Sequence, residues 1–86
     1  MAELLVRYFG AAKAAAGVAE ERLPAGRNLT DVLDGLRERP AVPGAPSISR
    51  VLDRSSFLLN EVALREHSTV LQDGDVLDIL PPFAGG

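Results

Sequence analysis

Apolar residues recur at helical spacing in one stretch near the middle of the chain. Four of them stand at positions i, i+3, i+4 and i+7: Leu29, Val32, Leu33 and Leu36. This spacing places them on one face of a helix. Asn28 can cap the first turn, and two arginines followed by a proline are typical of the other end. The pattern therefore predicts one amphipathic helix that must bury its apolar face against another element.

Short apolar runs rich in strand-forming residues lie on both sides of this helix. The predicted strands cover residues 4–9, 18–23, 56–64, with a turn near Asn60-Glu61, and 76–80. The alanines before Gly17 favour a short helix, and a further helical turn is expected after Ser47. Three prolines and a glycine make residues 40–46 a loop. This order of elements predicts an α+β domain, with one main helix packed on one face of a mixed sheet.

A glycine interrupts the predicted main helix. Gly35 costs about 1 kcal/mol of helix stability relative to alanine. We therefore expect this position to permit close contact between the helix and the sheet.

The composition is that of an ordinary globular domain. The 86 residues are 47% hydrophobic and 24% charged, which indicates a single domain with a modest core. The net charge is −3 and the basic residues are scattered, so the chain lacks the basic patch of a nucleic-acid-binding protein. No apolar run approaches about 18 residues and no signal peptide is evident, so we expect a cytoplasmic protein that does not cross a membrane.

The side chains offer few constellations that could catalyse a reaction or hold a metal. The chain has no cysteine, which excludes disulfides and thiolate metal sites. His67 is the only histidine and is expected in a loop or at the surface, while Asp73-Gly74-Asp75 is typical of a turn. A glycine-rich loop of the kind that binds ATP is absent. We therefore expect no bound metal or cofactor and no complete active site on this chain.

The chain ends in a slim tail whose last group is a glycine carboxylate. This tail, residues 81–86, consists of Pro81, Pro82, Phe83, Ala84, Gly85 and Gly86. The prolines favour an extended path, and glycines without Cβ atoms can pass where larger residues would clash. The extended tail could reach roughly 19 Å beyond a domain covering residues 1–80. By itself this pattern fits either an arm that delivers the carboxylate of Gly86 to a partner or a frayed terminus.

The segment from Leu71 to Gly86 carries a resemblance to a known family. Its D-G-D turn, hydrophobic strand and P-P-x-x-G-G ending are similar to the C-terminus of the MoaD/ThiS ubiquitin-like sulfur carriers. Residues 4–17, 29–36 and 59–61 resemble the family's first strand with its short helix, its main helix and its third-strand turn. The resemblance covers nearly the whole chain, and the tail is its most specific part.

This resemblance implies a β-grasp, ubiquitin-like fold and a chemical role for the tail. A partner related to ubiquitin-activating enzymes, of the MoeB type, would use ATP to adenylate Gly86, and the terminus would become a thiocarboxylate that donates sulfur. Leu80 either completes the core or contacts partners. We expect partner contacts from the residues at and after the end of the last strand: Leu80, Pro81, Pro82, Phe83, Ala84 and Gly85.

Within the family, the double proline and the loop at 40–46 are more similar to the small subunit of molybdopterin synthase than to thiamin carriers. The resemblance then implies that the tail enters a large, MoaE-type subunit, which supplies the residues that convert precursor Z into molybdopterin. Two small and two large subunits would form a heterotetramer. Phe83 departs from the smaller aliphatic residue common at its position in the family, which affects the detailed fit to the partner.

Three other functions remain open at this point. The chain could carry sulfur for thiamin, cysteine or another thio-metabolite, or it could be a ubiquitin-like modifier that joins Gly86 to lysines. It could also be a β-grasp binding module with an inert tail. The chemical fate of the Gly86 carboxylate distinguishes these functions from one another.

Overall fold

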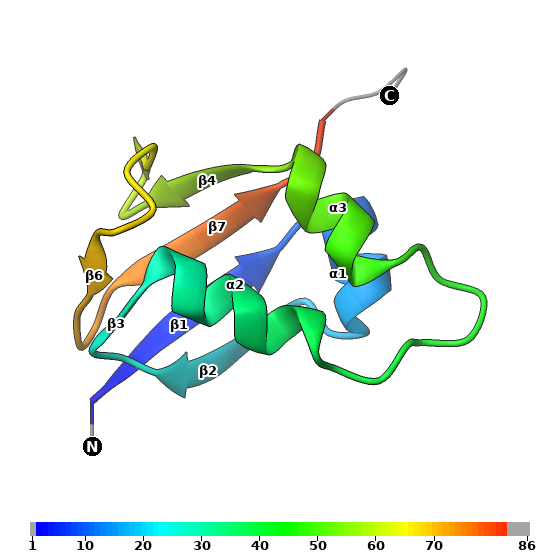
Figure 1. Ribbon diagram of the computed structural model, residues 1–86, viewed down its shortest axis with the longest axis horizontal. Helices are drawn as coiled ribbons and strands as arrows, with labels where there is room; N and C mark the ends of the chain where they lie inside the picture. The colour runs from blue at the N-terminus through cyan, green and yellow to red at the C-terminus, as the bar shows by residue number, and fades with distance from the viewer. Residues whose placement is uncertain (1, 83–86) are drawn as a thin grey trace.

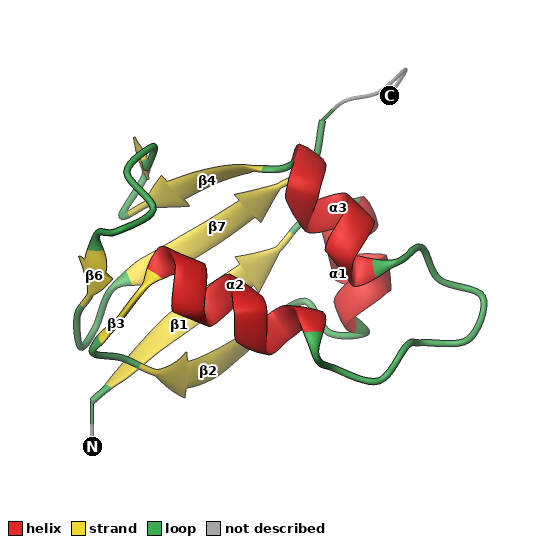
Figure 2. Ribbon diagram, in the orientation of Figure 1, coloured by secondary structure: helices red, strands yellow, loops and turns green. Residues whose placement is uncertain are grey.

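The computed structural model describes residues 2–82. In chain order its elements are β1 (Glu3–Tyr8), α1 (Ala11–Ala16), β2 (Glu20–Pro24), β3 (Arg27–Asn28), α2 (Leu29–Arg37), α3 (Ile48–Arg54), β4 (Ser56–Leu59), β5 (Val62–Ala63), β6 (Val70–Leu71) and β7 (Val76–Leu80). Figure 1 and Figure 2 show α2 lying across one face of the sheet, with α1 and α3 near one end of it. In this part of the chain, no helix is long and apolar enough to cross a membrane.

The main sheet has five strands in the order β2-β1-β7-β4-β5, and β3 and β6 form a separate two-stranded ladder. β1 and β7 run parallel, whereas the other pairs in the main sheet are antiparallel. The sheet is therefore mixed, as predicted. Its central strand is β7, which is hydrogen-bonded along both edges even though it comes last along the chain.

The hydrophobic core lies between this sheet and the helices. In β1 the burial alternates: Leu4, Val6 and Tyr8 are buried, whereas Leu5 and Arg7, which point to the other face, are only half-buried. This alternation follows from the two-residue period of a strand. One face of the sheet is thus covered by the helices, and we call the other the open face.

The main helix forms as its pattern predicts. All four residues of the apolar stripe are buried, and the Asn28 side chain accepts a hydrogen bond from the N–H of Asp31 at 2.8 Å as the N-cap. The expectation for Gly35 is wrong. A Cβ added there would have the Arg27 guanidinium as its nearest neighbour, 3.8 Å away, and no sheet backbone within contact. The reason is that Gly35 is exposed beside the buried stripe and does not belong to it.

The remaining differences from the predicted elements are small. The first strand is Glu3–Tyr8 where residues 4–9 were predicted, and the second begins at Glu20 because the chain is still turning after α1. The predicted helical turn after Ser47 is a helix of seven residues. The β3–β6 ladder was not predicted, since two-residue strands are too short to show a hydrophobic period.

The predicted turn at Asp73-Gly74-Asp75 is confirmed, and it fixes the start of β7. Asp73 accepts from the N–H of Glu3 at 2.9 Å, and Asp75 accepts from the N–H of Gln72 at 2.7 Å. The Asn60 side chain bridges to this turn, donating to Asp75 at 3.0 Å and accepting from the N–H of Val76 at 2.9 Å. The carboxylates therefore act as turn acceptors, and β7 is tied to both β1 and the β4–β5 hairpin.

Candidate functional site

The base of the tail continues directly from the central strand. β7 ends at Leu80, which pairs with Ser56 of β4, and Pro81 and Pro82 follow. Leu80 and Pro81 are half-buried and Pro82 is exposed, so Leu80 both borders the core and presents surface. The other predicted site residues lie outside the described residues: Phe83, Ala84, Gly85 and Gly86. The division into a domain, 1–80, and a tail, 81–86, stays a prediction.

Two residues that sequence reasoning did not select lie beside this base. The N–H of Phe9 donates to the carbonyl of Ile79 at 3.3 Å, which extends the parallel β1–β7 pairing by one step. A Cβ placed on Gly10 would lie 3.4 Å from Cγ of Pro81, so the proline ring lies against Gly10. These residues are distant in the sequence and meet only because β1 pairs in parallel with β7. No local sequence pattern predicts this pairing.

The open face of the sheet carries a band of partly exposed apolar side chains that leads to the tail base. The strand register and the alternation along each strand place these residues on one face: Leu5, Phe9, Leu58, Val76 and Leu80. Phe9 is 41% exposed. None of the described helices covers this face (Figure 1). Partly exposed apolar side chains grouped on one uncovered face are candidates for a protein–protein contact.

An ion pair lies in the middle of this band. The guanidinium of Arg7 forms a two-point contact with Asp78, with Nε–Oδ1 at 2.6 Å and Nη2–Oδ2 at 2.8 Å. The Asp78 side chain is 7% exposed, and the Arg7 guanidinium lies 5.9 Å from the centre of the Phe9 ring. The hydrogen bond to Asp78, together with its charge, raises the pKa of Arg7 above its ordinary value. Sequence reasoning missed the pair, although each residue interrupts an otherwise apolar strand.

A second polar cluster lies at the covered side of the same strand. The Tyr8 hydroxyl donates to Glu21 Oε2 at 2.6 Å and accepts from Arg39 at 3.2 Å, and Arg39 also pairs with Glu21. Burial, followed by the hydrogen bond to Glu21, raises the pKa of Tyr8 well above its ordinary value. This cluster joins β1, β2 and the segment after α2. Its groups satisfy one another, which is the pattern of a structural anchor.

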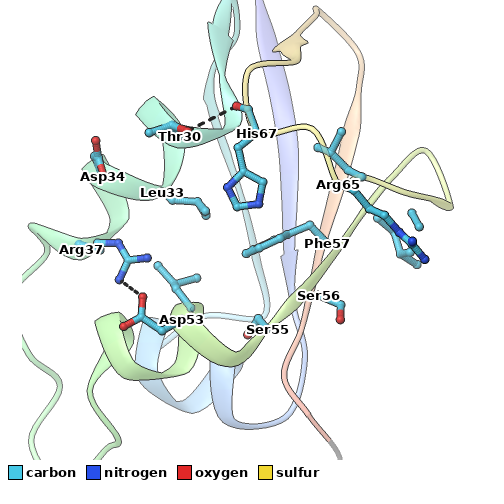
Figure 3. Close-up of a pocket in the computed structure, with 14 residues that line it drawn as sticks. Thr30, Leu33, Asp34, Arg37, Asp53, Ser55, Ser56, Phe57, Arg65 and His67 are labelled. Atoms are coloured by element: carbon cyan, nitrogen blue, oxygen red, sulfur yellow. Dashed lines mark hydrogen bonds and ion pairs between the residues drawn. The ribbon is translucent and has the colours of Figure 1, made fainter.

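A hollow lies between α2, α3 and β4 (Figure 3). It is open to solvent and measures about 580 Å³. In Figure 3 the Arg37 side chain points to Asp53, to which it is bound at 2.8 Å. His67 is exposed and its ring stands edge-on to Phe57 at 5.8 Å, so the prediction of a surface histidine is confirmed. Among the charged groups that line the hollow, Arg37 and Asp53 form an ion pair, and the hollow presents no nucleophile with an adjacent base.

Across residues 2–82, no three His, Cys, Asp or Glu side chains are grouped so that they could hold a metal ion. Every buried side-chain nitrogen and oxygen in this part of the chain has a hydrogen-bond partner. The tail base lies where the end of the central strand meets the open face.

Comparison with known proteins agrees with this architecture. The model of the ThiS family matches residues 6–86. A molybdopterin synthase sulfur carrier subunit of Phaeosphaeria nodorum is 32% identical over 84 residues, covering 94% of this chain and 88% of that protein.

Two solved structures share the fold across nearly the whole chain. The small archaeal modifier protein 1 of Methanosarcina acetivorans has a TM-score of 0.75 at 29% identity, covering 100% of this chain and 98% of the other. The complex of subunits 1 and 2 of the molybdopterin-converting factor from Helicobacter pylori contains a chain with a TM-score of 0.70 at 26% identity. That match covers 98% of this chain and 99% of the other.

These matches confirm the predicted fold and family. The mixed sheet with α2 across one face is the β-grasp, ubiquitin-like fold of those neighbours. The family model extends over the tail as well as the sheet. The chain therefore belongs to the ThiS family, and its relatives include the sulfur carrier subunits of molybdopterin synthase.

Proposed function

We propose that this chain is a sulfur carrier that serves as the small subunit of a molybdopterin synthase, with the Gly86 carboxylate as its reactive group. One observation carries the proposal: the central strand β7 runs from a firmly tied turn to Leu80 and then into a Pro-Pro-x-x-Gly-Gly ending. The relative from Phaeosphaeria nodorum, which bears the name of such a subunit, supports it. The described side chains hold the scaffold, and the chemistry belongs to the chain terminus.

The chemistry begins with an unreactive group. A carboxylate resists nucleophilic attack because its charge is delocalised and an oxide ion is a poor leaving group. In the proposed first step, an oxygen of the Gly86 carboxylate attacks the α-phosphorus of ATP and diphosphate leaves. A hydrosulfide equivalent then attacks the carbonyl carbon, AMP leaves with the bonding electron pair, and a thiocarboxylate remains. ATP is bound and used by the activating partner, not by this chain.

Donation returns the terminus to a carboxylate. The thiocarboxylate sulfur attacks an electrophilic carbon of the acceptor, an oxygen group on that carbon leaves with the bonding electron pair, and water then cleaves the acyl–sulfur bond. Sulfur remains on the product and the Gly86 carboxylate is regenerated. The chain thus returns to its starting state after each transfer and acts as a reusable carrier.

Two partners are part of the proposal. The first is an activating enzyme of the MoeB type, and the second is a large subunit of the MoaE type, with two copies of each subunit in a heterotetramer. The Helicobacter pylori neighbour, solved as a complex of subunits 1 and 2, supports the second. The open face, with Phe9 and Leu80 beside the tail base, is the surface we assign to docking. We place the reaction in the cytoplasm, where ATP is supplied.

Intact mass spectrometry tests the carrier chemistry. The chain is incubated with ATP, a sulfide source and an activating enzyme that is active on its own carrier. We expect a mass increase equal to the sulfur-for-oxygen difference, and no increase for a variant that lacks Gly86. An unchanged mass for the full chain under these conditions would count against the proposal. Addition of a large subunit and precursor should then return the original mass, which distinguishes molybdopterin synthesis from other sulfur pathways.

A second candidate function is protein modification, because a structural neighbour is named as a small archaeal modifier protein. In that case Gly86 forms amide bonds with lysines, and heavier species appear that are lost when Gly86 is deleted. Lys13 is the one lysine in the sequence. A Lys13→Arg variant therefore removes side-chain self-conjugation, so that species which persist report other acceptors.

A further inference from the structure

Two segments that are far apart in the sequence meet where the tail begins. Because β1 and β7 are parallel, both strands end at the same edge of the sheet. The chain leaves β1 through Phe9 and Gly10 into α1, and it leaves β7 through Pro81 into the tail. The hydrogen bond from Phe9 to Ile79 holds these two exits side by side.

The backbone at Gly10 takes a shape that suits glycine. Its φ is 52° and its ψ is −126°, and the N–H of Ala12 donates to the carbonyl of Phe9 at 2.9 Å. These values match the first central position of a type II′ turn, where a side chain is disfavoured. The strand therefore turns sharply into α1 at a residue without a Cβ.

The ring of Pro81 borders the position that a side chain on Gly10 would take. A Cβ on Gly10 would lie 3.4 Å from Cγ of Pro81, which is ordinary van der Waals contact, so an alanine would touch the ring and we expect a longer side chain to displace it. Pro81 is half-buried in this position, whereas the next residue, Pro82, is exposed. Proline also has a fixed φ, so a ring held in place restricts the direction in which the backbone continues.

We propose that Gly10 is a positioning residue: it holds the ring of Pro81 and thereby sets the direction in which the chain leaves β7 toward Gly86. This inference rests on the proposed carrier function. It separates two tasks, because the open face binds the partner while the Gly10–Pro81 contact orients the carboxylate once the partner is bound. Displacing Pro81 should therefore slow the reaction even at saturating partner.

The test compares Gly10→Val with Gly26→Val. Gly26 also has a positive φ, 88°, but a Cβ there meets nothing within 4 Å, so both variants strain the backbone and only one displaces Pro81. In the unmodified chain we expect a nuclear Overhauser effect between the α-protons of Gly10 and the ring protons of Pro81. The signal should persist in Gly26→Val. In Gly10→Val, where the side chain replaces the α-proton that faces Pro81, the chemical shifts of the Pro81 ring protons should change, whereas they should not change in Gly26→Val. Its absence from the unmodified chain would overturn the proposal.

The kinetic arm measures thiocarboxylate formation by mass at saturating activating enzyme. Since a displacement of about 1 Å can cost up to about 100-fold in rate, we expect Gly10→Val to lose about 10- to 100-fold and Gly26→Val less than about twofold. Adding Pro81→Ala to Gly10→Val removes the obstructing ring atoms and should recover part of the loss. Equal rates for the two valine variants would contradict the role of Gly10.

A second pair of variants, at Pro81 and Pro82, tests the proposal if Gly10→Val does not fold. Pro81→Ala keeps Gly10 but removes the ring that contacts it, while Pro82→Ala removes a proline with no such contact. We expect the first to lower the saturated rate more than the second, and the reverse order would overturn the proposal. If the unmodified chain itself is never thiocarboxylated, the proposed function fails. If it is converted and all variants match it, the positioning role alone fails.

Discussion

Neighbouring residues of β1 show how differently the two faces of the sheet are used. Tyr8 points to the covered face, where its hydroxyl is held by Glu21 and Arg39, and Arg7 points to the open face, where it binds Asp78. The first group closes the core, and the second lies among apolar side chains that no described helix covers. The difference indicates that the covered face supplies stability, while the open face is the surface that the proposed function assigns to partners.

The sharpest test of this comparison uses two adjacent leucines. Leu4 is fully buried on the covered face and Leu5 is half-buried on the open face. We expect Leu4→Ala to lower the free energy of unfolding by about 2–5 kcal/mol, because it leaves a cavity in a close-packed core. Leu5→Ala makes the same chemical change on the other face and should cost well under half as much. Equal losses in urea denaturation would show that the faces are not different.

A substitution on the open face should affect partner binding more than stability. Phe9→Ala should weaken binding to a large synthase subunit by about tenfold, or ~1.4 kcal/mol, if Phe9 is an anchor of the interface. Its thermal stability should change little, because Phe9 lies after the strand and is 41% exposed. Isothermal titration calorimetry and thermal unfolding measure the two quantities. Phe83→Asp, in the tail, should behave in the same way, and a large fall in melting temperature for either variant would place that residue in the core.

The polar cluster of the covered face should show a smaller effect. Tyr8→Phe removes hydrogen bonds to Glu21 and Arg39 while those two stay paired, and we expect a loss of about 1 kcal/mol in urea denaturation. Asp78→Asn, on the open face, removes the charge of a buried carboxylate that binds Arg7, so we expect it to lower stability as well as to alter partner binding. If the free energy of unfolding of Tyr8→Phe equals that of the unmodified chain, the Tyr8 hydrogen bonds do not contribute to stability.

The same tyrosine makes stability depend on alkaline pH. Burial raises the pKa of Tyr8 in the folded chain above the value of about 10 expected when it is unfolded. The protonated form is therefore favoured by folding, so this stabilisation is complete below about pH 10 and declines as the pH rises further. Tyr8 is the only tyrosine, so its ultraviolet titration reports this group alone. We expect tyrosinate to appear only as the chain unfolds, and early titration in the native state would contradict this.

The smallest expected effect is a gain in stability, at Gly35. Gly35→Ala should stabilise the chain by up to about 1 kcal/mol, since the position is exposed and an added Cβ meets only Arg27 at ordinary contact distance. Chemical denaturation measures the change. A loss of stability would restore the original expectation that the glycine permits a close approach.

Local patterns predicted the fold well where residues act with near neighbours. The stripe on α2, the Asn28 cap and the Asp73-Gly74-Asp75 turn depend on spacings of a few residues, and the structure confirms them. The prediction of Gly35 failed because a helical period gives a face only approximately and does not show which atoms oppose it.

Contacts between distant strands could not be read in this way. Arg7 and Asp78 bind across 71 positions, and Gly10 meets Pro81 only because β1 and β7 pair in parallel. A charged residue inside an apolar strand indicates that a group of opposite charge lies nearby. Which residue carries that charge depends on the order of the strands in the sheet. The tail residues Phe83 to Gly86 were chosen from sequence and family resemblance, and they lie outside the described residues.

The central position of β7 has a consequence for synthesis of the protein. The strand at the middle of the sheet is the last of the described strands to leave the ribosome. The main sheet therefore cannot be completed until β7 has been synthesised, because β7 joins β1 to β4. Contacts this distant along the chain are slow to form. A chain truncated before β7 would lack the centre of its sheet along with its tail. A partner that requires both the open face and the terminus would thus select chains that have been finished and folded.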